Sequence, residues 1–174
     1  MSIVLIGSTS GSITLQEPAV SGNTVLDLPN VSGTVLTTTS PKAGNVIQVV
    51  SNTTTSQVST SSTSFVSATL AASITPTSSS SKVFVIVNTV AQGSTTNSLY
   101  YTIYRGATNL GGTLGMALFS NGNGNEFPFG MSYLDSPSTT SSTTYTVYFR
   151  TNTGSVFMGE NNLTSSITVM EIAA

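Results

Sequence analysis

Residues 64–87 read SFVSATLAASITPTSSSSKVFVIV. This stretch consists of an alternating run, a polar turn rich in Ser, and a second run that is apolar on both of its sides. An antiparallel strand normally presents one apolar face to the core and a second face to water. No helical pattern follows that would cover the second face, so the sequence predicts that a neighbouring chain covers it. We therefore expect an oligomeric all-β protein with a structural or adhesive role.

Strand-forming residues dominate the chain from residue 44 to residue 174. No segment shows the i, i+3, i+4 apolar stripe of an amphipathic helix, whereas Val, Ile, Thr, Tyr and Phe are common. Turn residues recur about every ten positions, which is typical of a sandwich or barrel. We predict an all-β, antiparallel two-sheet β-sandwich of the jelly-roll type with an extended N-terminal arm. Strands are expected near residues 45–51, 65–74, 82–92, 98–104, 115–120, 129–134, 143–151, 155–159 and 166–172.

Alternation predicts which side chains share a face of each strand. In residues 82–90 the odd positions carry valines and Thr89, and the even positions carry Phe84 and Ile86. Residues 145–150 and 167–172 alternate in the same way. Burial of one large apolar side chain contributes about 1.5–3 kcal/mol. A few such side chains from each subunit around a shared axis would therefore give a strong association.

The first forty residues differ from the remainder. Ser-Gly pairs recur with a period of eleven at residues 10–11, 21–22 and 32–33, and a short apolar run follows each pair. We predict that residues 1–40 form an extended docking arm and that residues 44–174 form the sandwich, or knob. A flexible Ser/Gly tail is the alternative for the arm. The candidate docking side chains are Ile13, Leu15, Val25, Leu26, Leu28, Val35 and Leu36.

The composition argues against several partners. Only 6% of the 174 residues are charged, against about 25% in ordinary soluble domains. A monomer this poor in charge is weakly protected against self-association, although a monomer coated with Ser and Thr remains an alternative. The formal net charge is −2 and the four cations are scattered, so we expect no nucleic-acid partner.

The chain has no Cys and no His. It therefore lacks disulfides, thiolate chemistry and the usual ligands of transition metals, and no cofactor is expected. The apolar start, residues 1–7, is shorter than the core of a signal peptide, and no run approaches the length of a membrane span. We expect synthesis in a cytoplasm without a signal peptide, and no insertion into a membrane.

The sequence also predicts that the protein is not an enzyme. Without His, acid–base work would fall to six carboxylates that are scattered along the chain, and the many serines have no evident base. A pair of carboxylates that meets only in space remains possible in principle. The six acids are Glu17, Asp27, Glu126, Asp135, Glu160 and Glu171.

Residues 121–126 read NGNGNE and form the one candidate ligand loop. Alternating Asn oxygens and a closing Glu are similar to a calcium loop, but a single carboxylate would give low affinity. A plain Asn/Gly hairpin loop is the alternative, and the loop tip could also contact a sugar or a protein neighbour. The candidate residues are Asn121, Asn123, Asn125 and Glu126.

Several motifs resemble the distal β-sandwich of tail fibres and tailspikes of tailed bacteriophages. They are ITPTSSSSKV at residues 74–83, YTIYRG at 101–106, YLDSP at 133–137, TYTV at 144–147 and VMEI at 169–172. The arm, from GSITL at residues 11–15 to GTVLTT at residues 33–38, is similar to a motif of phage fibre and virion surface proteins.

The resemblance implies a homotrimeric sandwich like the tumour-necrosis-factor-like and complement-like heads. In such families aromatic and aliphatic side chains of one sheet pack around the three-fold axis. Alternation does not decide which face looks at the axis, and the tyrosines could also form a platform for stacking sugars. The candidates for the trimer interface are Phe84, Ile86, Tyr100, Tyr101, Tyr104 and Tyr148.

The chain departs from a tail fibre because it has no long shaft and no coiled-coil heptads. A short arm and a compact knob are more similar to a capsid decoration, or cement, protein on the outer surface of a virion. Its partner would be the major capsid protein. The alternative is the receptor-binding tip of a tail fibre that recognises host surface polysaccharide. A secreted adhesin or lectin is a third hypothesis.

Overall fold

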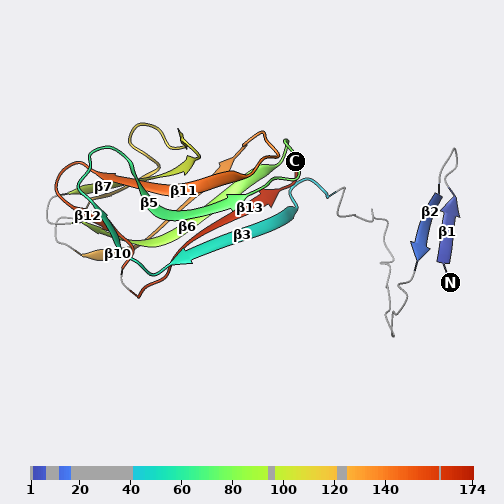
Figure 1. The fold of residues 1–174 in the computed structure, drawn as a ribbon, viewed down its shortest axis with the longest axis horizontal. Coiled ribbons are helices and arrows are strands. Elements are labelled where there is room, and N and C mark those ends of the chain that lie inside the picture. Colours follow the sequence, from blue (N-terminus) through green and yellow to red (C-terminus); the bar gives the residue numbers. More distant parts are fainter. Residues whose placement is uncertain (1, 7–11, 17–40, 94–96, 121–124, 161) are drawn as a thin grey trace. The chain divides into compact units, whose positions relative to one another are not determined.

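The computed structural model describes residues 2–6, 12–16, 41–93, 97–120, 125–160 and 162–174. These residues belong to two units, an N-terminal hairpin and a larger β-sandwich, and each is described by itself. The sandwich is drawn from cyan to red in Figure 1.

The first layer of the sandwich is a six-stranded sheet. Its strands follow the order β3-β13-β6-β12-β4, and β10 pairs with the other edge of β6. Every neighbouring pair is antiparallel. The strands are β3 (Val46–Thr54), β4 (Val58–Thr60), β6 (Lys82–Gly93), β10 (Glu126–Asp135), β12 (Val156–Met158) and β13 (Ser165–Ile172).

The second layer is a five-stranded antiparallel sheet. Its strands follow the order β5-β11-β7-β8, and β9 also pairs with β7. The strands are β5 (Val66–Ile74), β7 (Ser98–Arg105), β8 (Thr108–Asn109), β9 (Ala117–Ser120) and β11 (Thr143–Thr151). Figure 1 shows β3, β13 and β6 side by side in one layer and β5 beside β11 in the other.

The predicted fold class is confirmed, and every strand expected between residues 45 and 172 is present. The largest shifts in a boundary are of three residues: β10 begins at Glu126 rather than near residue 129, and β3 ends at Thr54 rather than near residue 51. Two short strands, β4 and β8, were not expected, because segments of two or three residues are too short to show a period of two.

The N-terminal hairpin pairs β1 (Ser2–Ile6) with β2 (Ser12–Gln16). The candidates Ile13 and Leu15 lie on β2, opposite Leu5 and Ile3. Residues 2–6 therefore form a strand. In the sequence analysis this apolar stretch was compared with a signal peptide and was not expected to be a strand. The other arm candidates, Val25, Leu26, Leu28, Val35 and Leu36, lie outside the described residues, as does the expected boundary at residue 40.

The core lies between the two sheets and follows the predicted alternation. Val83, Val85 and Val87 of β6 are fully buried, while Phe84 and Ile86 point to the opposite side of the strand. The inward residues of β11 and β13 alternate in the same way. They complete a core cluster with Leu70, Ile74, Leu99, Tyr101, Ile103, Tyr145, Val147, Phe149, Met158, Ile167 and Val169.

A partly buried ion pair joins the sheets at one end of this core. Asp135 ends β10 and accepts hydrogen bonds of 2.9 Å from the guanidinium of Arg105, at the end of β7. The hydroxyl of Tyr145, on β11, donates to the same carboxylate at 2.7 Å. Burial and this hydrogen bond raise the pKa of Tyr145, which keeps the hydroxyl protonated as a donor. The pair therefore connects the last residue of β10 to two strands of the opposite sheet.

A second buried carboxylate, Glu171 of β13, holds the turn that crosses from β5 to β6. It accepts hydrogen bonds from Gln48 at 2.6 Å and from both the backbone nitrogen and the hydroxyl of Thr77 at 2.8 Å. Burial acts to raise the pKa of Glu171, but hydrogen bonds from Gln48, Ser81 and Thr77 outweigh it, so the pKa is lowered. The ionised carboxylate is therefore the form that the fold stabilises.

We expect Glu171→Gln to lower the free energy of unfolding by about 1–3 kcal/mol near neutral pH, because one carboxylate oxygen becomes an NH2 donor that faces the donor of either Gln48 or Thr77. The lowered pKa means that the contribution of Glu171 is present above about pH 4.3 and is lost as the pH falls through the folded-state pKa. Urea unfolding at a series of acidic pH values measures this difference, which should shrink as the solution becomes more acidic.

The matched control is Glu126→Gln, because Glu126 is exposed at the start of β10. This variant should unfold within about 0.5 kcal/mol of the wild type at every pH. A Glu171→Gln variant that is as stable as the wild type near neutral pH would contradict the role given to the buried carboxylate.

Candidate interaction surface

The outward face of the six-stranded sheet carries an apolar row that crosses four strands. The register places Leu134 of β10 opposite Phe84 of β6, Phe84 opposite Met170 of β13, and Met170 opposite Val49 of β3. Leu134 and Val49, at the two edges, are 49% and 55% exposed. Phe84 and Met170, in the middle of the sheet, are half-buried.

Three further side chains widen this row into a band. Ile86 follows Phe84 on the same side of β6, and Ile172 lies opposite Val46 at the start of β3. Val46 is 53% exposed. We call the seven residues Leu134, Phe84, Met170, Val49, Ile86, Ile172 and Val46 the apolar band. Lys82, opposite Ile172, is the charged side chain at its border.

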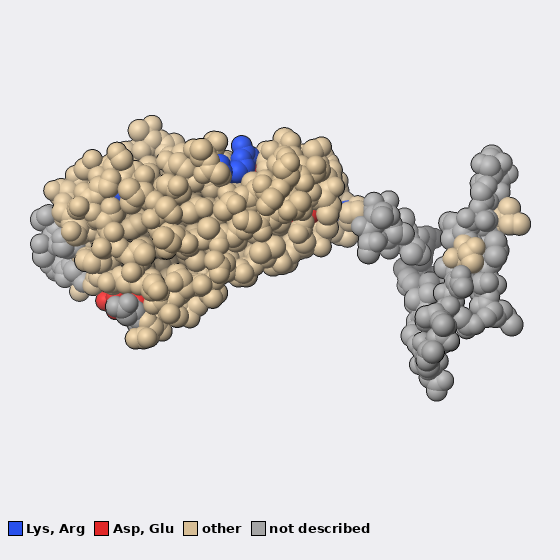
Figure 2. All heavy atoms as spheres, in the orientation of Figure 1, with Lys and Arg blue, Asp and Glu red and all other residues tan. Residues whose placement is uncertain are grey.

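The apolar band reverses the usual arrangement of a sheet that faces water. On the same strands, the next residue in register is Val83, and its two cross-strand partners are the buried acids Asp135 and Glu171. Carboxylates therefore point inward and large apolar side chains point outward at this end of the sheet. Figure 2 shows how few charged side chains lie on the visible surface of residues 41–174. A face of this composition is suited to burial against another protein.

The outward face of the five-stranded sheet carries a different group of side chains. The ring of Tyr104 stacks on Tyr148 with centroids 3.9 Å apart. The guanidinium of Arg150 lies 4.0 Å from the ring centre of Tyr100 and 5.2 Å from that of Phe65. These five residues form what we call the aromatic cluster, in which cation–π and ring contacts hold every member.

The six predicted interface residues do not form one surface. Phe84 and Ile86 belong to the apolar band, whereas Tyr100, Tyr104 and Tyr148 belong to the aromatic cluster on the opposite face of the sandwich. A single axis cannot be lined by both groups in one copy.

Tyr101 is a correction, because its side chain is 0% exposed and cannot reach any axis. Its ring stacks on Phe129 at 4.4 Å in the core, and its hydroxyl donates to the carbonyl of Phe157. The alternation of Leu99, Tyr101 and Ile103 is the sequence signal that separates it from its tyrosine neighbours.

The candidate ligand loop is described only at its end. Asn121 and Asn123 lie outside the described residues. Asn125 is exposed, and the carboxylate of Glu126 accepts a hydrogen bond of 3.2 Å from Gln92 on the neighbouring strand. Within the residues that the structure describes, no group of three acidic, His or Cys side chains is placed to bind a metal ion.

Sequence reasoning missed several residues of both surfaces. Leu134, Met170, Val49 and Val46 were not singled out, because only the pairing register aligns them with Phe84. Arg150 was noted only as a scattered cation, although its position opposite Tyr100 places its charge on an aromatic face. No helix in the described ranges is long and apolar enough to cross a membrane.

No protein-family model and no curated protein matches this sequence. Among solved structures, the chain is similar to one of infectious bursal disease virus, Gx strain, with 15% identity and a TM-score of 0.44 over 94% of this chain and 43% of that chain. For the Gt strain of the same virus the identity is 15% and the TM-score 0.42, over 98% of this chain and 46% of that chain. This protein therefore spans less than half of the length of either viral chain. A likeness of this size does not bear on function.

Two neighbouring positions of β6 test the assignment of the faces. Val85→Thr places a hydroxyl among buried apolar groups and should cost about 1–3 kcal/mol of unfolding free energy. Ile86→Thr keeps a β-branched side chain on the outward face, so in the dissociated chain it should cost less than Val85→Thr. Denaturant unfolding at low protein concentration measures both values. Equal losses at the two positions would contradict the assignment.

Proposed function

We propose that this chain is a non-enzymatic structural protein of a virion, a homotrimer that decorates and cements the outer surface of a phage capsid. The apolar band carries the proposal. Monomers rarely expose a contiguous apolar patch beyond a few hundred Å². The band crosses four strands, a width of about 19 Å at the usual strand spacing. Other copies of the chain would remove this surface from water.

The charge content supports the same conclusion. The chain has four basic and six acidic residues among 174. A net charge and charged side chains spread over the surface normally prevent non-specific association between protein molecules. A closed oligomer buries the apolar band in one defined contact and leaves the Ser- and Thr-rich surface to face water.

The resemblance of the arm and the knob motifs to phage virion surface proteins supports the proposed location on a capsid. A knob that carries three arms can dock on several capsid subunits at once, with the major capsid protein as partner. Each arm binds weakly, but once one arm is bound the others bind as intramolecular events at high effective concentration. Neighbouring capsid subunits would then separate only when several arms release together, which resists internal pressure.

The described acids support a role without catalysis. Asp135 and Glu171 are buried and bound by donors of the fold. Glu160 accepts a hydrogen bond of 2.6 Å from Gln57, and Glu126 accepts one from Gln92. Each of these four carboxylates thus has a structural partner.

Removal of residues 2–38 tests the docking role of the arm. The truncated chain keeps the apolar band and should remain a soluble trimer in sedimentation equilibrium, but it should no longer cosediment with shells that lack the protein. The matched control keeps the length of the arm and replaces its seven apolar candidates by Ser, and it should also fail to bind. Full occupancy of shells by the truncated chain would contradict this role.

A second candidate function is the receptor-binding tip of a tail fibre. The aromatic cluster favours it, because ring faces beside a guanidinium suit the apolar faces and hydroxyls of a sugar. Leu118, which lies opposite Tyr100 and is 59% exposed, extends this surface. The number of copies separates the two functions: many copies over the shell indicate decoration, and a few at the tail indicate a tip.

If the chain is a tip, Tyr148→Ala should weaken binding to host polysaccharide about 2-fold to 10-fold, because one stacking ring is lost. Titration of purified lipopolysaccharide into the wild type and the variant measures the change. Leu163→Ala, in the exposed loop before β13 of the other sheet, is the control and should bind like the wild type. A wild type that binds no polysaccharide rules this function out.

A further inference from the structure

The guanidinium of Arg150 lies between two aromatic rings on the outward face of the five-stranded sheet. Arg150 of β11 pairs with Tyr100 of β7, and Tyr100 pairs with Leu118 of β9. Strand β5 pairs with the other edge of β11, and Phe65 directly precedes it. The ring centres of Tyr100 and Phe65 lie 4.0 Å and 5.2 Å from the guanidinium carbon. These four residues therefore form one row across the sheet, with the charge between two rings.

No carboxylate on this sheet neutralises Arg150. The five strands contain no acidic residue, and their other basic residue, Arg105, bonds to Asp135 of the opposite sheet. The four acids of the described chain all bond to groups other than Arg150; they are Glu126, Asp135, Glu160 and Glu171. Within the described residues, Arg150 is therefore a cation without a counterion.

The ring contacts leave most of the donors of Arg150 available. A guanidinium carries five N–H donors in its plane, whereas a ring face attracts the charge of the whole group. The hydrogen bond that this group does make is long, 3.4 Å from Nη1 to the carbonyl oxygen of Thr63. The side chain is half-buried, so its charge has lost part of its hydration. A planar anion at the edge of the guanidinium would receive two parallel hydrogen bonds in place of that water.

Apolar surface lies next to this cation. Leu118 is 59% exposed, and the rings of Tyr100 and Phe65 are half-buried. Tyr104, in its stack with Tyr148, contacts the ring of Phe65 edge to face, with ring centres 6.4 Å apart. Four residues of β7 separate Tyr104 from Tyr100, which corresponds to about 13 Å. A matching ligand carries a negative charge on a ring with an apolar face and extends over more than one such ring.

We propose that the aromatic cluster binds an acidic polysaccharide, with Arg150 as the residue that receives the carboxylate of a uronic acid unit. This inference rests on the second candidate function, the binding of host surface polysaccharide, and names its class of sugar. The C–H face of the sugar ring suits Tyr100 and Leu118, and its carboxylate suits the edge of the guanidinium. A single cation matches a carboxylate, with one charge, better than a phosphate with a charge of about −1.5 to −2.

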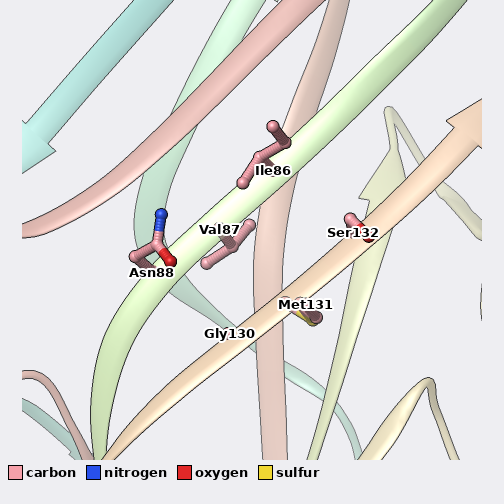
Figure 3. A pocket seen from close by; sticks show the side chains of 6 residues that line it. All are labelled: Ile86, Val87, Asn88, Gly130, Met131 and Ser132. Carbon is pink, nitrogen blue, oxygen red and sulfur yellow. The ribbon is translucent and has the colours of Figure 1, made fainter.

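The hollow on the opposite face of the sandwich lacks this charge. It has a volume of about 330 Å³ and lies between β6 and β10. Figure 3 shows its lining residues, which are Ile86, Val87 and Asn88 on one strand and Gly130, Met131 and Ser132 on the other. The hollow offers hydrogen bonds to a neutral sugar through Asn88 and Ser132, but it offers no counterion to a carboxylate. It is therefore the comparison site for a sugar that binds without regard to charge.

The test compares one polysaccharide with and without its charge. Polygalacturonate and its fully methyl-esterified form have the same rings and linkages, but only the first carries carboxylates. Calorimetric titration into the full-length protein at low ionic strength should give an affinity about 10-fold to 100-fold higher for the acid form. An increase in salt from about 0.05 M to about 0.5 M should weaken binding of the acid form and leave binding of the ester unchanged.

Substitutions of Arg150 separate its charge from its shape. Arg150→Gln should bind both forms with the affinity of the ester, because the charge is lost. Arg150→Lys keeps the charge but lacks the planar pair of donors, so it should retain only part of the preference for the acid form. Thermal unfolding checks that each variant is folded. The salt dependence of the wild type and the Arg150→Lys variant test the proposal even where Arg150→Gln does not fold.

Two control variants alter the opposite face of the sandwich. Lys82→Gln removes the same charge from an exposed position beside the apolar band, so it controls for the net charge of the protein. Asn88→Ala removes the carboxamide from the hollow. Both variants should keep the affinities of the wild type for the acid form and for the ester.

The outcomes separate the class of ligand from the function. A wild type that binds both forms equally, or an Arg150→Gln variant that keeps the preference, overturns the role of Arg150 and leaves polysaccharide binding in place. Loss of binding in Asn88→Ala assigns the sugar to the hollow and overturns the site. Polyglutamate that displaces the acid form with equal affinity assigns the site to an acidic protein segment instead. A wild type that binds neither form overturns this inference, whereas the titration of lipopolysaccharide decides the second candidate function by itself.

Discussion

The position of two buried carboxylates determines which way the six-stranded sheet faces. Asp135 and Glu171 flank Val83 in one cross-strand row, and each is held by donors that belong to the opposite sheet or to the turn that leads from it. A buried carboxylate without its partners costs several kcal/mol. A slip of one residue in β10 or β13 would move the acid of that strand to the outside, so the ion pair and the hydrogen bonds fix the register at this end.

The apolar band follows from that register. Because side chains alternate with a period of two, inward acids on β10 and β13 force Leu134 and Met170 outward beside Phe84. If β10 and β13 were turned so that Leu134 and Met170 faced the core, the hydrogen bonds of Asp135 and Glu171 would be broken. The same bonds that close the sandwich therefore place an apolar surface on its outside. The buried network that stabilises the sandwich and the apolar band on which the proposed association rests therefore have a common physical origin.

The sequence predicts the strands and their faces well because alternation is a local property. It predicts neither register nor pairing, because these depend on contacts between residues far apart, such as Arg105 with Asp135, and on irregularities such as the shift between Glu171 and Ile172. Tyr101 shows that a resemblance between motifs does not assign individual side chains to a face. Alternation separates Tyr101 from its neighbours, but the resemblance placed all the tyrosines together at an interface. The candidate surface was predicted only where β6 carries it, since its other members come from strands that the sequence cannot align.

Pro128 and Gly130 violate the strand preference inside β10. Such conflicts between local preference and structure tend to mark function, because selection otherwise removes them. Taken separately, the proline protects an edge and the glycine weakens a strand. Taken together, they act on one strand: Pro128 removes a backbone donor from β10, and Gly130 removes a side chain from the outward face two residues further on. A sheet whose edge strand lacks this donor is less prone to add strands from other chains, which leaves the apolar outward face as the surface for the proposed association.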